Sequence, residues 1–551
     1  MTLGQTIEGI YLADEAAGLR LAGWLASRLT AGDCVLLSGD LGAGKTTLAR
    51  GIIRMLCGMD TEVPSPTFTL LQHYQPGAEP YEIIHADLYR LGGVEETEEL
   101  GLFEAMDERV VLIEWPERLA GAWPQNYLRL ALAEPESQAD AGSGRMLSLG
   151  GDAASLQRFQ DIGDYMARDA ALTEFIAAHN WDDATRRQIA GDASSRRYER
   201  LERPEGHERP ERHDTKSQKA ILMDWPPSAS SSTSSTSSSG TADRRDYARQ
   251  VHLAGTTGAF SAIAGYLRTC GLSAPDCLAQ DNAQGFMLLE DFGNDTMTRF
   301  IDRHDPRLPI FYHEAVLALV KLHQAGVPEV LPLDGSDTGY PLPLYDAGVM
   351  MVEARQFIDW YLPMQNKTLD EAALTDWHKV WADLIEGLAE HQVEEQAEGG
   401  QDETPAIPDV LILRDVHSPN LHWLEHLQAT ARVGFIDVQD AIRGHPAYDV
   451  VSLLQDARRD VDPQLAVSCL ALYLAESGLP AQRFNAAYAF FGAQRNIRIA
   501  GVFARLAMRH NKPRYLQHMP RVLGYIAENL RHPALAPLKD WLAQHVPEVL
   551  E

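Results

Sequence analysis

Residues 39–46, with the sequence GDLGAGKT, have the residue types and spacing of a loop that binds phosphate groups. They fit the pattern G-x-x-x-x-G-K-[ST], in which backbone N–H groups surround the phosphates, the lysine reaches the β and γ oxygens, and the hydroxyl binds Mg²⁺. The glycines permit positive φ angles and leave room for an anion, and the positive end of the next helix points toward it. The residues expected to bind the nucleotide are Gly39, Gly42, Ala43, Gly44, Lys45, Thr46 and Thr47.

Two acidic residues follow apolar segments at positions where they could join this loop. Residues 83–89 (IIHADLY) and 110–115 (VVLIEW) are each predicted to be a strand whose apolar part ends in a carboxylate, Asp87 or Glu114. Since ligands of a parallel sheet bind beyond the carboxyl ends of its strands, we expect both carboxylates near the Mg²⁺ held by Thr46. One would bind the metal or its water, and the other would orient the attacking water. Each acid alone could equally be a solvated strand end.

Residues 410–421 (VLILRDVHSPNL) and 433–440 (VGFIDVQD) have the spacing of a second phosphoryl-transfer site. In kinase-type transfer, one Asp orients the acceptor hydroxyl and takes its proton, while an Asn five residues later and an Asp after the next strand bind Mg²⁺. We assign Asp415 as the base, and Asn420 and Asp437 as metal ligands.

Two further segments could bind the nucleotide of this second site. A turn of small residues contains Ser194 and Ser195, whose hydroxyls and neighbouring N–H groups could bind phosphates without a lysine, although a plain hairpin also explains the pattern. Residues 285–293 (GFMLLEDFG) are predicted to be an apolar strand that ends in acids. We expect it to form the hinge between two lobes, where backbone groups around Glu290 and Phe292 could hydrogen-bond an adenine.

The elements that position these residues require more than one domain, because 551 residues are too many for a single hydrophobic core. We predict an α/β protein. A P-loop NTPase domain with a parallel-type sheet occupies residues 1–155, a linker spans 156–167, and an α+β two-lobed domain of the protein-kinase type follows at 168–551. Insertions at 202–219 and 226–243 are charged or rich in Ser and Thr, and they contain too few apolar residues to fold.

Composition restricts the partners and the compartment. The 48 basic and 78 acidic residues give a net charge of −30, which argues against direct binding of a nucleic-acid backbone, so a partner protein would have to hold any nucleic acid. Five scattered cysteines without a C-x-x-C pair predict neither a disulfide framework nor a zinc site, and they fit a reducing cytoplasm. The N-terminus lacks a signal-peptide pattern, and no apolar run approaches the roughly 18 residues of a membrane span. We expect a cytoplasmic protein that does not contact a membrane.

The first half resembles the TsaE family, bacterial ATPases needed to make threonylcarbamoyladenosine in tRNA. The motifs that carry this resemblance are GDLGAGKTT (39–47), SPTF (65–68), HADLYR (85–90) and IEWPERL (113–119). The resemblance implies ATP hydrolysis in support of the modification of tRNA position 37, with TsaB- and TsaD-like partners that would carry the tRNA. It also implies Thr46 and Glu114 at Mg²⁺, Asp87 beside them, and Thr67 and Trp115 near the nucleotide.

The second half resembles the aminoglycoside phosphotransferase superfamily and, within it, the AmgK-type kinases of cell-wall amino sugars. The motifs that carry this resemblance are GDASSRRY (191–198), ILMDWPP (221–227), LLEDFG (288–293), FIDWY (357–361), RDVHSPNL (414–421), GFIDVQDA (434–441) and QRNIRIAGVFARL (494–506). The resemblance implies ATP-dependent phosphorylation of the anomeric hydroxyl of N-acetylmuramate or N-acetylglucosamine, a step of peptidoglycan recycling.

Two positions depart from the superfamily pattern. Leu413 stands where a His usually precedes the catalytic Asp by two residues, and Met223 stands where kinases place the phosphate-binding lysine. Two alternatives therefore stay open: the second half is a catalytically inactive kinase-like binding module, or it is an antibiotic phosphotransferase. Polar and aromatic residues that could line a substrate pocket, although core packing explains them as well, are Glu353, Trp360, Tyr361 and Arg495.

Overall fold

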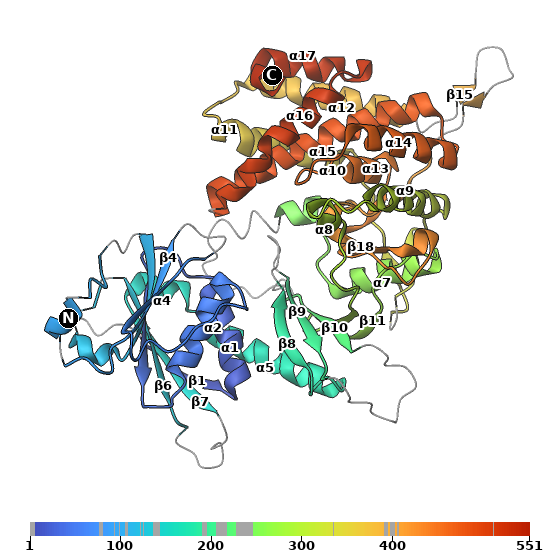
Figure 1. Cartoon of the computed structure of the whole chain (residues 1–551). Helices are drawn as coiled ribbons and strands as arrows, with labels where there is room; N and C mark the ends of the chain where they lie inside the picture. Colours follow the sequence, from blue (N-terminus) through green and yellow to red (C-terminus); the bar gives the residue numbers. More distant parts are fainter. Residues whose placement is uncertain are drawn as a thin grey trace. The chain divides into compact units, whose positions relative to one another are not determined.

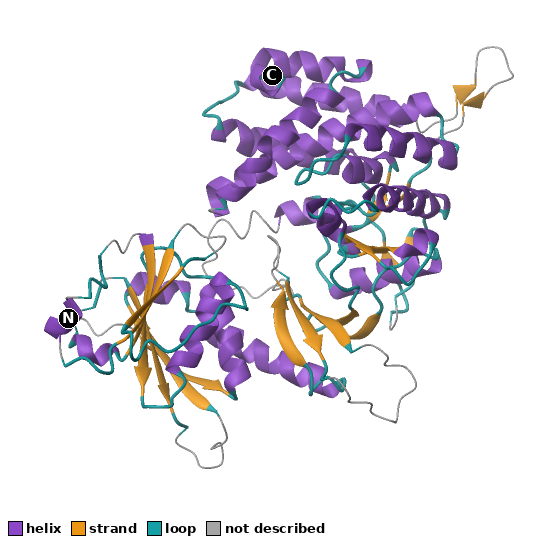
Figure 2. Cartoon of the chain, in the orientation of Figure 1, coloured by secondary structure: helices purple, strands orange, loops and turns teal. Residues whose placement is uncertain are grey.

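The chain divides into two compact units in a computed structural model, residues 1–190 and 191–551. The structure describes residues 6–76, 81–92, 94–98, 100–104, 108–121, 123–124, 126–135, 144–189, 196–204, 218–226, 246–333, 336–390, 395–396, 403–404, 407–510 and 512–550. Ser194, Ser195 and most of the two expected insertions lie outside these residues. Figures 1 and 2 show an α/β first unit and a second unit that is largely helical.

A sheet of seven strands in the order β1-β7-β6-β2-β5-β4-β3 forms the centre of the first unit. Its strands are β1 (Thr6–Leu12), β2 (Cys34–Gly39), β3 (Leu71–Tyr74), β4 (Glu82–Asp87), β5 (Arg109–Glu114), β6 (Tyr127–Ala133) and β7 (Arg145–Gly151). The helices and the last strand of this unit are α1 (Glu15–Ala26), α2 (Lys45–Cys57), α3 (Val94–Glu98), the 3₁₀ helix η2 (Pro116–Leu119), α4 (Ala153–Arg158), α5 (Ile162–Ala178) and β8 (Thr185–Ile189). The central strands β6, β2, β5 and β4 are parallel, which confirms the expected sheet type.

Both faces of this sheet are covered, and β2 shows how the sequence encodes this. Side chains alternate across a strand, so Val35 and Leu37 contribute to the core that includes α1 and α2, while Cys34 and Leu36 contribute to the core on the opposite face. A strand buried on both faces is apolar at every position, which is why CVLL carries no period-two pattern. Helix α2 begins at Lys45, immediately after the glycine-rich loop.

The expected linker at residues 156–167 is mostly helical. Leu156 lies on α4, Phe159 lies in the turn after it, and Ile162 begins α5, and all three are buried in the core beside α1 and α2. The packing of the first unit thus continues through this segment. The exact domain boundary stays a prediction.

The second unit begins with antiparallel strands in the order β11-β12-β10-β9. These strands are β9 (Arg197–Glu202), β10 (Lys219–Asp224), β11 (Cys277–Asp281) and β12 (Phe286–Glu290). Short antiparallel pairs elsewhere in the unit join β13 (Val330–Leu331) to β14 (Tyr340–Pro341), β15 (Glu395–Gln396) to β16 (Glu403–Thr404), β17 (Val410–Ile412) to β20 (Ile442–Gly444), and β18 (Leu421–Trp423) to β19 (Val433–Phe435).

Helices make up most of the remaining unit (Figure 2). They are α7 (Thr257–Thr269), α8 (Met297–Asp302), α9 (Leu308–Gln324), α10 (Ala347–Gln356), the π-helix η4 (Phe357–Tyr361), α11 (Leu362–Met364), α12 (Glu371–Glu390), α13 (Ala447–Leu454), α14 (Pro463–Ser477), α15 (Ala481–His510), α16 (Met519–Asn529) and α17 (Ala536–His545). The 3₁₀ turns are η5 (Ser418–Asn420), η6 (Ala429–Arg432), η7 (Val438–Asp440), η8 (Pro513–His518), η9 (Pro533–Leu535) and η10 (Pro547–Val549). One hydrophobic core joins these helices to the strands.

Two features of the whole chain bear on its chemistry. All five cysteines carry free thiols. Among the helices that the structure describes, none combines the length and the apolar character needed to cross a membrane.

Candidate active sites

The predicted phosphate-binding loop joins β2 to α2 and leaves the start of that helix without a side-chain cap. Gly39, Gly42 and Gly44 have φ angles of 137°, 83° and 103°, in the left-handed region where a side chain is strained. A Cβ atom on Gly39 would also lie 2.3 Å from the carbonyl oxygen of Leu132. The glycines therefore shape a loop whose helix presents free N–H groups, which is the geometry that binds an anion.

Lys45 is held by its own loop and by an aromatic ring. Its Nζ donates to the carbonyl oxygens of Gly39 at 2.7 Å and Asp40 at 2.8 Å, and it lies 3.7 Å from the centre of the Trp115 ring. Burial lowers the pKa of Lys45, and nearby carboxylates, Glu114 foremost, partly oppose that effect. The structure therefore brings Trp115 to the loop, as expected.

The two predicted carboxylates lie side by side at the ends of neighbouring parallel strands. Asp87 on β4 pairs with Glu114 on β5 in register, and both are almost fully buried. Thr46 Oγ1 donates to Glu114 Oε2 at 2.7 Å, and Thr67 Oγ1 donates to Asp87 Oδ2 at 2.6 Å. Hydroxyl and carboxylate oxygens are the ligands that Mg²⁺ prefers, so these residues fit the expected ion.

A histidine that the motif interpretation left unused supports Glu114. His85 is fully buried on β4, and its Nε2 lies within hydrogen-bond distance, 2.9 Å, of Glu114 Oε1. Glu114 thus directs one oxygen to His85 and the other to Thr46. His85 and Asp87 are two residues apart, so their side chains share one face of β4. Since Asp87 was expected beside Glu114, the sequence could also have placed His85 near Glu114.

The second predicted site forms where two short strand pairs meet. Asn420 Nδ2 donates to the carbonyl oxygen of Asp415 at 3.1 Å, and Ile436 N donates to the carbonyl oxygen of Asn420 at 3.0 Å. These bonds link the Asp415 loop to the end of β19, where Asp437 has a left-handed φ of 59°. Asp415, Asn420 and Asp437 are therefore brought together, as the spacing predicted.

The charges at this site are unevenly distributed. Burial raises the pKa of Asp437, and the negative charges of Asp415 and Asp440 raise it further. Burial alone would also raise the pKa of Asp415, but positive groups, His417 first and then Arg498, outweigh it and hold that pKa below its usual value. A divalent cation would relieve the repulsion between the carboxylates, and the amide of Asn420 adds an oxygen ligand, so the residues fit Mg²⁺.

Asp440 and Arg196 are functional candidates that motif spacing missed. Arg196 lies just before β9, with Nη1 2.9 Å from Asp437 Oδ1 and Nη2 3.9 Å from Asp440 Oδ2. An acid three residues after Asp437 was visible in the sequence. The contact of Arg196 with Asp437 joins residues too distant along the chain for any local pattern to indicate it.

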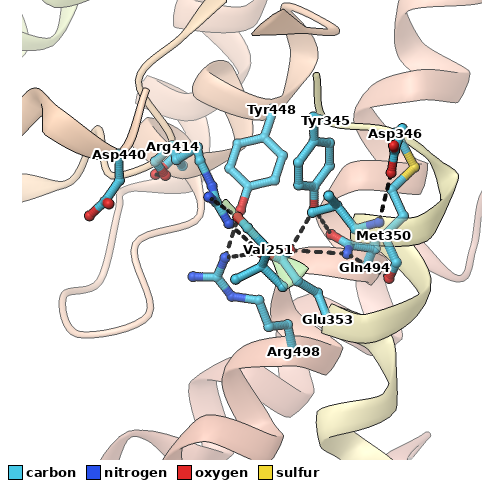
Figure 3. A network of polar contacts seen from close by, with 12 residues as sticks. Val251, Tyr345, Asp346, Met350, Glu353, Arg414, Asp440, Tyr448, Gln494 and Arg498 are labelled. Atoms are coloured by element: carbon cyan, nitrogen blue, oxygen red, sulfur yellow. Dashed lines mark hydrogen bonds and ion pairs between the residues drawn. The ribbon is translucent and has the colours of Figure 1, made fainter. Parts of the chain in front are cut away.

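A buried ionic network holds the residue that precedes Asp415 (Figure 3). Arg414 donates from Nη1 to the carbonyl oxygen of Val251 at 2.9 Å and from Nη2 to Glu353 Oε1. The same Glu353 oxygen accepts from Arg498 Nη1 at 2.9 Å. Glu353 Oε2 accepts from Tyr345 at 2.6 Å and from Gln494 at 3.3 Å. Both oxygens of this fully buried carboxylate therefore accept hydrogen bonds.

Hydrogen bonds also hold the backbone of the loop around Arg414. Asp449 accepts from the N–H groups of Leu413 at 2.7 Å and Arg414 at 2.9 Å, while Ser452 Oγ donates to the carbonyl oxygen of Arg414 at 3.1 Å. Asp456 accepts from the N–H of Ser418 at 3.0 Å. The loop is therefore anchored at several points even though Leu413 replaces the usual His.

Residues 185–484 match the model of the phosphotransferase enzyme family. This match covers more than half of the chain. The chain belongs to the phosphotransferase enzyme family. Residues 12–142 match the model of threonylcarbamoyl adenosine biosynthesis protein TsaE. Both resemblances expected from the motifs are confirmed.

Individual relatives agree with these two matches. An N-acetylmuramate/N-acetylglucosamine kinase of Caulobacter vibrioides is 38% identical over 384 residues, which cover 69% of this chain and 97% of the relative. A kinase of the same name from Pseudomonas aeruginosa is 27% identical over 398 residues, 70% of this chain and 96% of the relative. The tRNA threonylcarbamoyladenosine biosynthesis protein TsaE of Rickettsia conorii is 50% identical over 106 residues, 19% of this chain and 59% of that relative's length.

The expected hinge of the phosphotransferase unit is well ordered by its own contacts. The Glu290 N–H donates to the carbonyl oxygen of Asp276 at 2.9 Å. The Phe292 ring packs against His422. A Cβ atom on Gly434 would lie 2.7 Å from the Phe292 ring, so a glycine is needed beside it. Adenine binding by this segment stays a prediction.

The four substrate-pocket candidates of the phosphotransferase unit lie mainly in packed surroundings. Glu353 belongs to the network around Arg414, and Arg495 is buried and donates to Ser452 Oγ at 2.9 Å. Tyr361 is buried and stacks on Phe357, and Trp360 packs partly buried against the core. Their side chains thus serve packing and loop support.

Proposed function

We propose that this chain is a bifunctional enzyme. Its first unit is a TsaE-type ATPase that supports threonylcarbamoyladenosine formation at tRNA position 37, and its second unit is an ATP-dependent kinase of the anomeric hydroxyl of N-acetylmuramate or N-acetylglucosamine. The observation that carries the proposal is that each unit gathers its predicted acidic residues at one point, Asp87 and Glu114 in the first and Asp415 and Asp437 in the second. The names of the relatives supply the substrates.

In the kinase unit, Asp415 would hydrogen-bond the acceptor hydroxyl and take its proton as the oxygen attacks the γ-phosphorus of ATP. The new O–P bond forms while the bond from the γ-phosphorus to the β-bridging oxygen breaks, and ADP leaves. The low pKa of Asp415 keeps it ionised near neutral pH, so it is ready to accept the proton. Asn420 and Asp437 would hold Mg²⁺, which neutralises charge on the phosphates.

In the ATPase unit, Thr46 and Glu114 would hold Mg²⁺, and Asp87 would orient the attacking water with Thr67 fixing its carboxylate. Backbone N–H groups of the loop would bind the phosphates, and Lys45 would exchange its carbonyl contacts for phosphate oxygens. We infer that TsaB- and TsaD-like partners carry the tRNA, because a net charge of −30 does not suit direct binding of tRNA. Both reactions would take place in the cytoplasm.

A substrate panel tests the kinase proposal. The purified full chain is given ATP and Mg²⁺ with N-acetylmuramate, N-acetylglucosamine or aminoglycosides, and phosphate transfer is measured. We expect transfer to the amino sugars alone, and a loss of about 10²–10⁴-fold in Asp415→Asn. Transfer to aminoglycosides would instead identify an antibiotic phosphotransferase.

Calorimetry of Mg-ATP binding to the Lys45→Ala chain addresses the remaining alternative, because this substitution weakens the first nucleotide site. An inactive kinase-like binding module would transfer phosphate to nothing and need not bind the nucleotide. Binding with sugar phosphorylation supports the kinase. If the variant neither binds Mg-ATP nor phosphorylates a sugar, the kinase proposal is wrong.

A further inference from the structure

We propose that Arg196 is the cationic residue that binds the ATP phosphates in the phosphotransferase unit, in place of the lysine that Met223 replaces. This inference rests on the proposed kinase function and adds a ligand-binding residue to it. Kinases commonly use a lysine on the strand equivalent to β10 to hold the phosphates, and β10 has Met223 at that position.

Met223 cannot supply that charge, and its surroundings show where a replacement must come from. It is fully buried on β10, with Tyr198 of β9 and Met287 of β12 as its neighbours in register. The basic residues that the structure describes within β9, β10 and β12 are each paired with an acid other than Asp437. These pairs are Lys219 with Glu202, Arg197 with Asp224, and Arg200 with Asp291.

Arg196 is placed differently from these three residues. Its guanidinium lies at the predicted metal ligands, with Nη1 2.9 Å from Asp437 Oδ1 and Nη2 3.9 Å from Asp440 Oδ2. Its side chain is only 12% exposed and lies over the Trp225 ring, 5.1 Å from the centre. The backbone just ahead of β9 therefore delivers a shielded positive charge to the place where the triphosphate must lie if Asp437 holds its Mg²⁺.

The charges explain how one residue can serve both states of the site. Without nucleotide, Arg196 offsets the repulsion among Asp415, Asp437 and Asp440. An arginine guanidinium stays protonated at neutral pH, so Arg196 keeps its positive charge beside these carboxylates. If Mg²⁺ binds Asp437, the metal neutralises the charge of that carboxylate, and Arg196 can bind nearby phosphate oxygens instead. A guanidinium binds such oxygens through two parallel N–H bonds.

The test measures nucleotide affinity rather than turnover. The full chain with Lys45→Ala is the parent, so that binding reports the second unit, and ATP and adenosine are titrated with and without Mg²⁺. In the parent, Arg196→Met should weaken ATP binding by roughly 10- to 100-fold, the equivalent of one charge-assisted hydrogen-bond partner, and leave adenosine affinity unchanged. Arg196→Lys should recover part of the loss. Arg197→Met, which removes the neighbouring charge paired with Asp224, should bind ATP as the parent does.

Three results would overturn the inference. Unchanged ATP affinity in Arg196→Met would show that this residue does not contact the phosphates. An equal loss for ATP and adenosine would show that it only supports the fold. If the parent itself binds no ATP, the kinase proposal fails and this inference fails with it, which separates that case from a failure of Arg196 alone.

Discussion

In the proposed function both candidate sites bind a magnesium triphosphate, and they use backbone and side chains in opposite ways. In the first unit, a loop of eight residues supplies N–H groups, and its glycines at 39, 42 and 44 adopt left-handed φ angles that would strain a side chain. In the second unit, side chains from distant segments supply the charges, and Tyr198 and Asp437, which lie 239 residues apart, meet at 3.5 Å. Backbone sites are local in sequence, whereas side-chain sites need the whole fold to form.

The same contrast holds for the acids to which the proposed function gives a chemical role. Glu114 is oriented by Thr46 and His85, which lie on elements next to its own strand. Asp415 instead depends on Arg414, whose partner Glu353 lies on α10 and is itself held by residues of α15 (Figure 3). The second site should therefore respond to substitutions far from its reacting atoms more strongly than the first.

The largest effect tests whether the sites act separately. Lys45→Ala should reduce ATP hydrolysis by the first unit at least about 10²-fold, since it removes the charge that meets the phosphates. Sugar phosphorylation should stay unchanged in that variant, and Asp415→Asn should give the converse pattern. Both activities are measured on each full-length variant, so each substitution is the control for the other. A joint loss from either one would contradict two independent sites.

Local patterns predicted much of the fold and both sets of acids. The loop 39–46 and the strands that end at Asp87 and Glu114 could be predicted because the motif and the hydrophobic pattern indicate the same elements there. The spacing from Asp415 to Asn420 likewise predicted two residues that the structure brings together in the second candidate site. The linker at 156–167 stays a prediction, although Leu156, Phe159 and Ile162 within it pack in the core of the first unit.

Other features lay beyond a single sequence for physical reasons. Trp115, Arg414 and Asp437 adopt left-handed φ angles of 61°, 68° and 59°, and no glycine marks these positions. Such strain persists only where surrounding contacts enforce it, and those contacts are non-local. The partnership of Glu353 with Arg414 spans 61 residues, so its helical position suggested only packing or a pocket.

The second largest effect concerns this buried network. Glu353→Gln should lower the kcat of sugar phosphorylation by roughly 10- to 100-fold, because Arg414 loses its ionic partner and the Asp415 loop shifts. The KM for ATP should stay near that of the wild type. Tyr345→Phe, which removes one hydrogen bond to Glu353, should give a smaller decrease of the same kind.

A matched control for this substitution is Glu329→Gln. Glu329 is 84% exposed and also pairs with an arginine, Arg443, so removal of its charge should change neither kcat nor KM. A rise in KM without a fall in kcat in Glu353→Gln would show that this carboxylate serves binding rather than the position of the loop.

A smaller effect is expected at the corresponding support of the first site. His85→Asn should slow ATP hydrolysis by about tenfold, since Glu114 loses the contact that orients it while Thr46 remains. His73→Asn is the matched control, because His73 also lies beside a glutamate, Glu82, but is 52% exposed. If His85→Asn proves as damaging as Glu353→Gln, the idea that the first site is the more locally supported one is wrong.

The smallest effect separates the buried histidines of the two units. His85 is paired with a carboxylate, whereas His422 packs against Phe292, and burial lowers the pKa of His422 to about 4. A histidine with a lowered pKa stabilises the folded state fully above its unfolded pKa of about 6.5, and this stability is lost as the pH falls toward 4. From pH 7 to pH 6, the free energy of unfolding should therefore fall by roughly 0.7 kcal/mol more in the wild type than in His422→Gln. Denaturant titrations at both pH values measure this difference, and the exposed His426, replaced by Gln, should produce none.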